Sequence, residues 1–174
     1  MNKITGTIIT LNAEKYILRA IESLKNISDE IIVLDSKSTD STRDIAKSAG
    51  AKVYTQEFLG DGLQKKEASN FASNSWIFSL DADEYLDQDL IDFIKKTDLS
   101  SISYDSFAFR RKNYCADEWI KAAGFYPDYV TRLYDKSRVN YDSRADHAAV
   151  VSKNTLKTNC HIVHTTYELS LIHI

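Results

Sequence analysis

Short apolar runs alternate with helical patterns over the first hundred residues, and this order limits the folds open to the chain. The runs cover residues 7–11, 30–34, 51–54 and 75–80. Between them, apolar side chains recur at the three-to-four spacing of a helix, most clearly over residues 17–24. Strands that alternate with helices through short connections predict βαβ units, and therefore a mostly parallel sheet covered by helices.

Polar residues at the ends of these runs predict where the helices begin and stop. Asn12 follows the first run and is expected to cap the first helix. Ser38, Thr39 or Asp40 is expected to cap a second helix, which closes at Gly50. A third helix is expected over residues 63–72, and a fourth begins near Asp87.

The second half of the chain differs in pattern from the first. Residues 106–111 alternate like a strand with one wet face, and aromatic residues then crowd a loop-rich region. No repeat or linker interrupts the 174 residues, so we expect one domain over 1–168. Its halves are a nucleotide-binding part, about 1–98, and an acceptor-side part, about 99–168.

Composition excludes several classes of protein. The formal net charge of −3 argues against a nucleic-acid-binding surface. No apolar stretch approaches the roughly 18–20 residues that cross a bilayer. The two cysteines are too few for a disulfide framework, which favours a reducing, cytoplasmic compartment.

The segment Asp81-Ala82-Asp83-Glu84 directly follows the apolar run 75–80. A strand that ends in two carboxylates one residue apart places them at the rim of the sheet, where ligands of open α/β sheets bind. Carboxylates this close repel each other unless a cation lies beside them, and Mg²⁺ or Mn²⁺ favours such oxygen ligands. The alternative is an acidic turn before the helix that begins near Asp87.

Other nucleotide-binding folds fit the chain poorly. The segment after the first strand, 10–14, lacks the glycines of a dinucleotide-binding turn, and the P-loop pattern is absent. A haloacid-dehalogenase-type phosphatase would carry its paired aspartates on the first strand, whereas here they follow the fourth.

Taken together, the motifs of this chain resemble the GT-A fold of the family 2 glycosyltransferases. The matching segments are 10–14 (TLNAE), 34–42 (LDSKSTDST), 60–66 (GDGLQKK), 80–84 (LDADE), 110–114 (RRKNY), 124–129 (GFYPDY), 132–134 (RLY) and 164–167 (HTTY). They are most similar to the branch that adds sugars to the inner core of bacterial lipopolysaccharide, typified by β-1,4-glucosyltransferases acting on heptose.

The resemblance implies an inverting transferase that moves a hexose, expected to be glucose from UDP-glucose, with Mn²⁺ or Mg²⁺ as cofactor. It places Asp35 on the uracil or ribose, Lys65 near the base or diphosphate, and the metal on Asp83 with Asp81 beside it. The implied donor-binding residues are Thr10, Leu11, Asn12, Glu14, Asp35, Ser36, Lys65, Asp81, Ala82 and Asp83.

The catalytic base is where the sequence departs from its relatives, which carry glutamate where this chain has Ala148. Asp128, inside a matched motif, and Asp146 are the two candidates. An acceptor or a phosphate is expected to contact Arg132, Trp119, Tyr126 and His164. Arg110 and Arg111 are candidates for phosphate pairing or for solvated strand edges. Cys160, His161 and His164 favour an ordinary strand over a zinc site, because no second Cys/His pair exists.

The expected partners are a UDP-sugar and a lipid-linked glycan at the inner face of the inner membrane, reached by peripheral association. The competing class is a nucleotide-sugar-binding module without transfer activity, favoured by the missing glutamate. Residues 169–174 do not resemble the segment at this place in relatives, and we expect them to be foreign to the fold of a truncated reading frame.

Overall fold

The computed structural model describes residues 3–115, 118–121, 126–142 and 148–167. The helices are α1 (Ile17–Leu24), α2 (Thr42–Ser48), α3 (Asp61–Asn70) and α4 (Gln88–Lys96). The strands are β1 (Ile4–Thr10), β2 (Glu30–Asp35), β3 (Lys52–Thr55), β4 (Trp76–Asp81), β5 (Glu84–Leu86), β6 (Ser106–Cys115), β7 (Glu118–Trp119), β8 (Asp128–Asp135) and β9 (Thr155–Tyr167).

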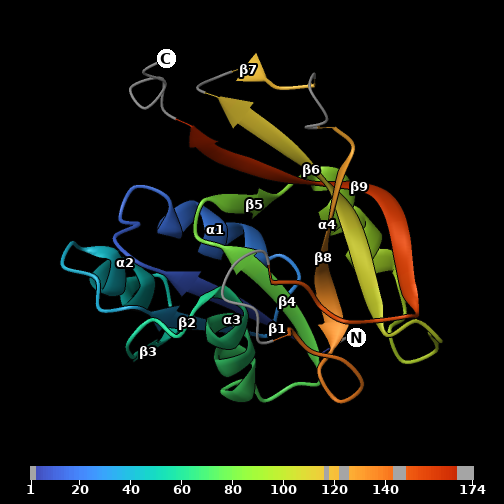
Figure 1. Ribbon diagram of the computed structural model, residues 1–174, viewed down its shortest axis with the longest axis horizontal. Coiled ribbons are helices and arrows are strands. Elements are labelled where there is room, and N and C mark those ends of the chain that lie inside the picture. Colours follow the sequence, from blue (N-terminus) through green and yellow to red (C-terminus); the bar gives the residue numbers. More distant parts are fainter. Residues whose placement is uncertain (1–2, 116–117, 122–125, 143–147, 168–174) are drawn as a thin grey trace.

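One mixed sheet runs through the molecule in the order β3-β2-β1-β4-β8-β6-β9-β5, with β7 paired to β6. The first four strands of this order are parallel, as the alternating pattern predicted. Beyond β4, strand β8 is antiparallel to β4 and to β6, while β9 runs parallel to β6. The long strands β6 and β9 rise above the parallel half as a curled extension of the sheet (Figure 1).

The parallel half brings the polar strand ends to one edge. In the register, Thr10 at the end of β1 lies beside Asp35 at the end of β2, and Ile9 lies beside Asp81 at the end of β4. Thr55 of β3 lies beside Asp35. The residues expected from sequence to meet at the carboxyl edge therefore follow the ends of neighbouring strands.

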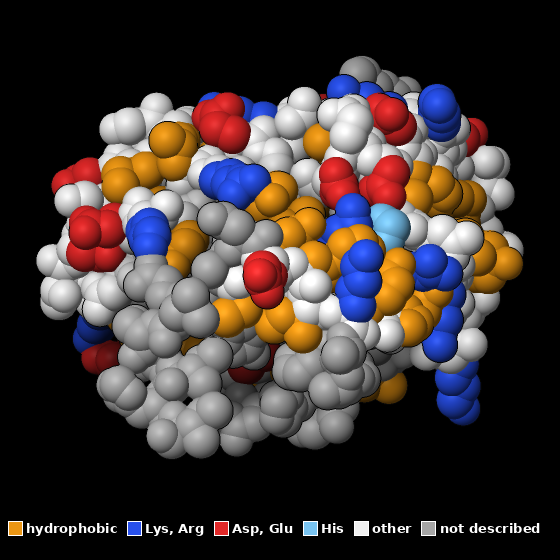
Figure 2. Space-filling view, turned by 90° about the horizontal axis from the view of Figure 1, so that it is seen from above, with side chains coloured by type: hydrophobic (Ala, Val, Ile, Leu, Met, Phe, Trp, Pro, Cys, Tyr) orange, Lys and Arg blue, Asp and Glu red, His pale blue; other side chains and the backbone are white. Residues whose placement is uncertain are grey.

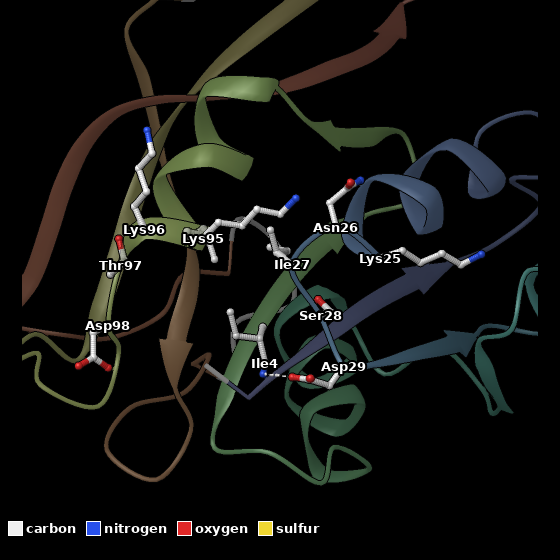
Figure 3. Close-up of a pocket in the computed structure, with 11 residues that line it drawn as sticks. Ile4, Lys25, Asn26, Ile27, Ser28, Asp29, Lys95, Lys96, Thr97 and Asp98 are labelled. Atoms are coloured by element: carbon white, nitrogen blue, oxygen red, sulfur yellow. Dashed lines mark hydrogen bonds between the residues drawn. The ribbon is translucent and has the colours of Figure 1, made fainter. Parts of the chain in front are cut away.

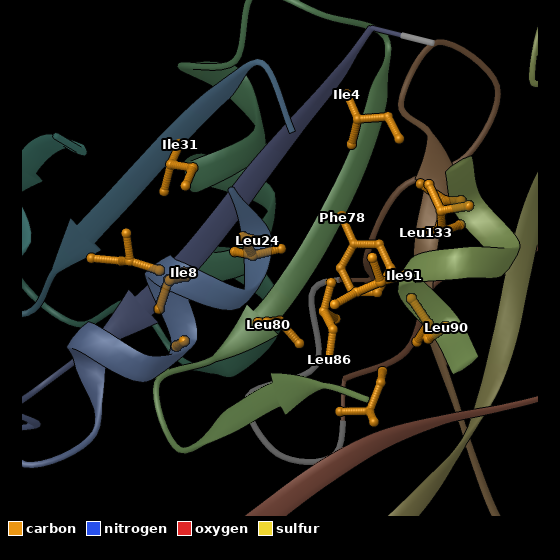
Figure 4. Packing of buried hydrophobic residues seen from close by; sticks show 14 of the residues in the cluster. Ile4, Ile8, Leu24, Ile31, Phe78, Leu80, Leu86, Leu90, Ile91 and Leu133 are labelled. Atoms are coloured by element: carbon orange, nitrogen blue, oxygen red, sulfur yellow. The ribbon is translucent and has the colours of Figure 1, made fainter. Parts of the chain in front are cut away.

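The main core lies where the parallel strands meet α1 and α4. Phe78 and Leu80 of β4 pack in one cluster with Leu24 of α1 and with Leu90 and Ile91 of α4 (Figure 4). Ile77 points to the opposite face, into a smaller cluster with Ala72, Tyr134 and Tyr141. Strand β4 is thus buried on both faces, which explains its continuous apolar run.

Two details of the predicted elements are corrected. Helix α1 begins at Ile17, not at Asn12, which has a left-handed φ of 49° and accepts a hydrogen bond from Thr39 N instead. Asparagine adopts this conformation more readily than most residues. Strands β5 and β7 were not predicted, because two or three residues are too few to show a period. Strand β8 was not predicted either, because its tyrosines were assigned to the aromatic, loop-rich region.

Two other expectations are confirmed. Asp87 caps α4, since its Oδ1 accepts the Gln88 N–H at 2.8 Å. The segment with Cys160 and the two histidines lies within strand β9, as expected from the lack of a zinc-ligand pair.

Asp146 and residues 168–174 lie outside the described residues, so the expectations made for them stay predictions. Among the described residues, no helix is long and apolar enough to cross a membrane.

At the amino-terminal edge of the sheet, Glu30 gives a testable pH dependence. Burial opposes its ionisation, but Lys52, Ser73 and Thr5 donate to its carboxylate and lower the pKa of Glu30 from 4.5 to about 2. A lowered folded-state pKa adds stability above the unfolded value, and that stability is lost as pH falls from about 4.5 to about 2.

We expect Glu30→Gln to lower the melting temperature by a few degrees at pH 7. The gap from wild type should shrink between pH 4.5 and pH 2, and calorimetry across this range will measure it. A difference in melting temperature that stays constant across this range would contradict the lowered pKa of Glu30.

Candidate functional site

A cavity of about 430 Å³ opens at the carboxyl edge of the parallel strands. It lies between the ends of β1 and β4, which are neighbours in the sheet. Its lining residues are Ile9, Thr10, Leu11, Asn12, Ala13, Tyr16, Ser36, Phe58, Asp81, Ala82 and Asp83. Most of the residues predicted to bind a nucleotide-sugar are therefore gathered around one space, whereas Glu14, Asp35 and Lys65 do not line it.

The wall formed by the loop between β1 and α1 is locked to the turn that follows β2. Asn12 N donates to Ser38 Oγ at 2.8 Å, and Ala13 N donates to Thr42 Oγ1 at 2.8 Å. Glu14 joins the same seam, because its Oε2 accepts from Ser41 N at 3.0 Å. Asn12, through its N–H and through Oδ1, which accepts from Thr39 N, and Glu14, through Oε2, thus fix the rim of the cavity.

Asp35 is fully buried, and its carboxylate turns into the loop that it begins. Its Oδ1 accepts from Ser38 N at 2.9 Å, and its Oδ2 accepts from Ser38 Oγ. Since Ser38 also holds Asn12 N, Asp35 supports the cavity through the loop. Ser36, the next residue, is the one that lines the space.

Polar and apolar groups of the cavity suit a ligand with a flat ring and hydroxyl groups. The Thr10 hydroxyl is buried and has no hydrogen-bond partner among the described residues, although such groups are normally satisfied. Leu11 and Phe58 line the space and are more than half exposed, so they offer apolar surface at its mouth. Phe58 and Tyr16 were not among the predicted site residues; the only signal for Phe58 was an apolar pair, Phe58-Leu59, in a polar loop.

Asp81 is held between two cations. Its Oδ1 lies 2.9 Å from Lys65 Nζ, and its Oδ2 lies 2.6 Å from Arg132 Nη2. Burial alone would raise the pKa of Asp81, but the charges of Arg132 and Lys65 outweigh it and hold this pKa well below its usual range. Asp81 is therefore ionised, and both of its oxygens already meet cations of the protein.

Asp83 faces a histidine. Its Oδ2 lies 3.5 Å from His164 Nε2, and His164 Nδ1 lies 2.8 Å from Asn113 Oδ1. Because Asn113 Nδ2 donates to Asp128, its Oδ1 is the acceptor, which assigns the proton of His164 to Nδ1. The other ring nitrogen, Nε2, faces the Asp83 carboxylate. A carboxylate oxygen and an imidazole nitrogen at this separation form a donor set that suits a divalent ion.

A second chain of contacts reaches Asp128 through Glu84. Arg132 Nη2 lies 2.6 Å from Glu84 Oε1, and Arg111 Nη1 lies 3.4 Å from the same oxygen. Arg111 also donates through Nε to Asp128 Oδ2 at 2.8 Å. Glu84 and Asn113 were not predicted as site residues, although both stand inside matched segments, 80–84 and 110–114.

Trp119 and Tyr126 lie in a different group of contacts. Their rings meet edge to face at 5.1 Å, and Tyr126 Oη contacts His161 Nε2 and Arg110 Nη1. Lys121 lies over the Trp119 ring. Because side chains alternate along β6, Arg110 points away from the face that carries Arg111 and Asn113. The acceptor role of both aromatic residues stays a prediction.

Figure 2 shows a face of the molecule on which Lys and Arg side chains interleave with hydrophobic ones around a histidine. The described contacts of Trp119 and Tyr126 have this mixed character, because each ring meets cations and neighbouring rings. Their partners come from β6, from β9 and from the segment after β7, so this group is built separately from the cavity at the ends of β1 and β4.

A larger cavity, of about 570 Å³, lies at the opposite end of the sheet (Figure 3). Its walls are the first residue of β1, the segment 25–29 after α1, and the end of α4 with the loop behind it. The Lys95 side chain extends toward Ile27 and Asn26, and the Ile4 N–H donates to Asp29. Ligands of α/β sheets bind at the carboxyl ends of strands, so the cavity at the ends of β1 and β4 is the better candidate.

A further carboxylate–histidine group, Asp87, Asp89 and His161, lies at the start of α4. Each of its two carboxylates already has a partner. Lys112 Nζ lies 2.6 Å from Asp87 Oδ2, and His161 Nδ1 lies 2.6 Å from Asp89 Oδ2. The group is better explained as the capped and ion-paired start of α4 than as a metal site.

Residues 7–157 match the family described as glycosyl transferase family 2. An uncharacterized glycosyltransferase of Rickettsia prowazekii is 41% identical over 145 residues, which are 81% of this chain and 49% of the relative. The lipopolysaccharide core biosynthesis glycosyltransferase LpsC of Rhizobium meliloti is 29% identical over 164 residues, 88% of this chain and 58% of LpsC. The chain thus spans about half the length of these relatives.

Two solved structures share the fold. Staphylococcus aureus TarS, residues 1–349, in complex with UDP-GlcNAc superposes with a TM-score of 0.70 at 16% identity, over 96% of this chain and 59% of that one. Glucosyl-3-phosphoglycerate synthase of Mycobacterium tuberculosis, with Mn²⁺ and UDP bound, gives 0.52 at 24% identity, over 63% of this chain and 44% of that one. Each supports the expected GT-A fold, and at these identities the likeness concerns the fold alone.

Proposed function

The chain belongs to glycosyl transferase family 2, and from this we propose that it moves a hexose from a UDP-sugar to a glycan acceptor with inversion. The observation that carries the proposal is the cavity at the ends of β1 and β4, which is lined by Asp83 and by Thr10, whose buried hydroxyl has no hydrogen-bond partner in the described part of the chain. Uridine fits its apolar mouth, and the diphosphate lies toward Asp83. TarS, which shares the fold, was solved with UDP-GlcNAc.

The proposed metal ligands are Asp83 and His164, which face each other at 3.5 Å. Asn113 supports this pair by holding the proton of His164 on Nδ1, and partners that orient a ligating histidine commonly tune metal affinity. Asp81, whose two oxygens meet Lys65 and Arg132, supports the site from behind. When bound, Mn²⁺ or Mg²⁺ would neutralise the charge that develops on the leaving diphosphate.

Asp128 is the proposed base that takes the proton of the acceptor hydroxyl. Among the described residues, the hydrogen bonds of its carboxylate are made by Oδ2, with Arg111 and Asn113. Oδ1 is therefore the oxygen available to an acceptor. Asn113 also contacts His164, so one side chain joins the proposed base to the proposed metal ligand.

For the acceptor we propose a lipopolysaccharide core or a related envelope glycan, met by peripheral association at a membrane surface. The support is LpsC, whose name states a role in lipopolysaccharide core biosynthesis. Glucose is the proposed sugar. Trp119, Tyr126 and Arg132 stay candidates for acceptor contacts, with Arg132 the one joined to the site by Asp81.

The competing function is a nucleotide-sugar-binding module without transfer activity. The observation that favours it is the contact between Arg111 and Asp128, because a carboxylate oxygen bonded to a guanidinium is already occupied when an acceptor hydroxyl approaches. The transfer reaction nevertheless remains the better account, since Asp128 keeps one oxygen outside the pair.

A thermal-shift panel followed by a UDP-release assay tests the proposal. UDP-sugars with Mn²⁺ should raise the melting temperature more than GDP- or dTDP-sugars, because a ligand that binds the native state stabilises it. UDP-glucose should release UDP faster when a heptose-containing acceptor is added. Stabilisation by UDP-sugars without acceptor-dependent release favours the binding module. No stabilisation by any nucleotide-sugar would contradict both functions.

A further inference from the structure

We infer that Glu84 is a positioning residue for transfer, which holds Arg132 and Arg111 and through them joins the donor-side carboxylate Asp81 to Asp128. The inference rests on the proposed function, which supplies the roles of Asp81 and Asp128. It adds a residue that touches neither donor nor acceptor, because the Glu84 side chain is wholly buried.

Both oxygens of Glu84 are engaged. Oε1 accepts from Arg132 Nη2 at 2.6 Å and from Arg111 Nη1 at 3.4 Å, and Oε2 accepts from Asp81 N at 3.2 Å. A buried carboxylate is costly unless it is paired and hydrogen-bonded, and here both conditions hold. The Glu84 side chain therefore contacts the end of β4, Arg132 of β8 and Arg111 of β6.

These contacts extend into a chain of alternating charge. From α3 to β8 its members are Asp61, Lys65, Asp81, Arg132, Glu84, Arg111 and Asp128. The links measure 3.1, 2.9, 2.6, 2.6, 3.4 and 2.8 Å. Four carboxylates and three cations alternate, so each cation lies between two anions. Glu84 is the only anion of these four that lies between two arginines.

The position of Glu84 in the sheet places it beside the proposed metal ligand as well. Glu84 opens β5 and pairs directly with His164 of the antiparallel strand β9. Asp83, one residue earlier, faces His164 through its side chain. The strand pairing thus fixes the position of Glu84 relative to His164. Arg132 connects Glu84 to Asp81, and Arg111 connects Glu84 to Asp128.

Arg111 is the link that matters for the reaction. It is only partly buried and contacts Asp128 through both Nε and Nη2. Without the negative charge of Glu84, Arg111 loses one of its two anions and is free to shift with Asp128. Displacement of a catalytic group by about 1 Å can cost roughly 100-fold in rate. Lys65 and Arg132 still hold Asp81, so donor binding should be affected much less.

A double-mutant cycle tests this inference. Glu84→Gln, which keeps the size of the side chain, should lower kcat for UDP release from UDP-glucose with a heptose-containing acceptor by about 10-fold or more. The affinity for UDP with Mn²⁺ should stay within about threefold, because Asp83 and His164 are untouched. In an Asp128→Asn background, Glu84→Gln should cause little further loss, since residues that act as a unit are not additive.

Glu30→Gln is the matched control, because Glu30 is also a strand glutamate with several donors but lies at the other end of the sheet. It should lower stability and leave kcat unchanged. Arg111→Gln provides a second variant if Glu84→Gln does not fold, and it should reproduce the fall in kcat. An unchanged kcat in Glu84→Gln or Arg111→Gln, or losses that add fully to that of Asp128→Asn, would overturn the inference. If Asp128→Asn itself keeps wild-type turnover, it is the proposed base that fails.

Discussion

Asp83→Ala is expected to abolish Mn²⁺-dependent binding of UDP, with a loss of affinity of roughly 100-fold or more. The carboxylate that faces His164 would be gone, and Asp81 cannot replace it because its oxygens meet Lys65 and Arg132. The melting temperature should change little, since the Asp83 side chain is partly exposed. Isothermal titration with UDP in Mn²⁺ and in EDTA measures the effect.

Asp44→Ala is the control for this variant, because Asp44 is an exposed carboxylate on α2 that does not line the cavity. It should bind UDP as the wild type does. If Asp83→Ala retains Mn²⁺-dependent affinity, the metal assignment is wrong.

Asp128→Asn is expected to lower the transfer rate by about 10²- to 10⁴-fold, the usual contribution of a general base. Asparagine keeps the size and an acceptor oxygen for Arg111 but cannot take a proton at neutral pH. UDP binding should therefore stay close to wild type. The measurement is UDP release under saturating UDP-glucose and Mn²⁺, with binding checked by titration.

Asp146→Asn is the paired variant, since Asp146 was the other candidate base. If Asp128→Asn keeps its turnover while Asp146→Asn loses it, the role of base passes to Asp146. Full retention of turnover in both variants would show that neither aspartate is the base.

The centre of the parallel half could be predicted because β2 and β4 are buried on both faces and read as continuous apolar runs. The end of β1 shows the limit of such patterns. Asn12 looked like a helix cap, yet its amide accepts from Thr39, on a loop 27 residues later. A contact of this kind depends on which strands are neighbours, and that order is a property of the whole sheet.

From the strand pattern, only those residues of the site that directly follow a predicted strand could be predicted. Asp81 and Asp83 could be found because they follow a strand directly, and the structure shows why the two differ. Asp81 meets cations from α3 and β8, while Asp83 faces β9. Glu84 and Asn113 were missed, because their partners are distant in sequence and become neighbours only when β6, β8 and β9 pair.

The most direct test of the donor site is a crystal structure of the protein with UDP and Mn²⁺. The anomalous signal should place the manganese ion between Asp83 and His164, within bonding distance of both. Uracil should lie in the cavity beside Thr10 and Leu11. Manganese at Asp87, Asp89 and His161, or UDP bound outside this cavity, would contradict the account.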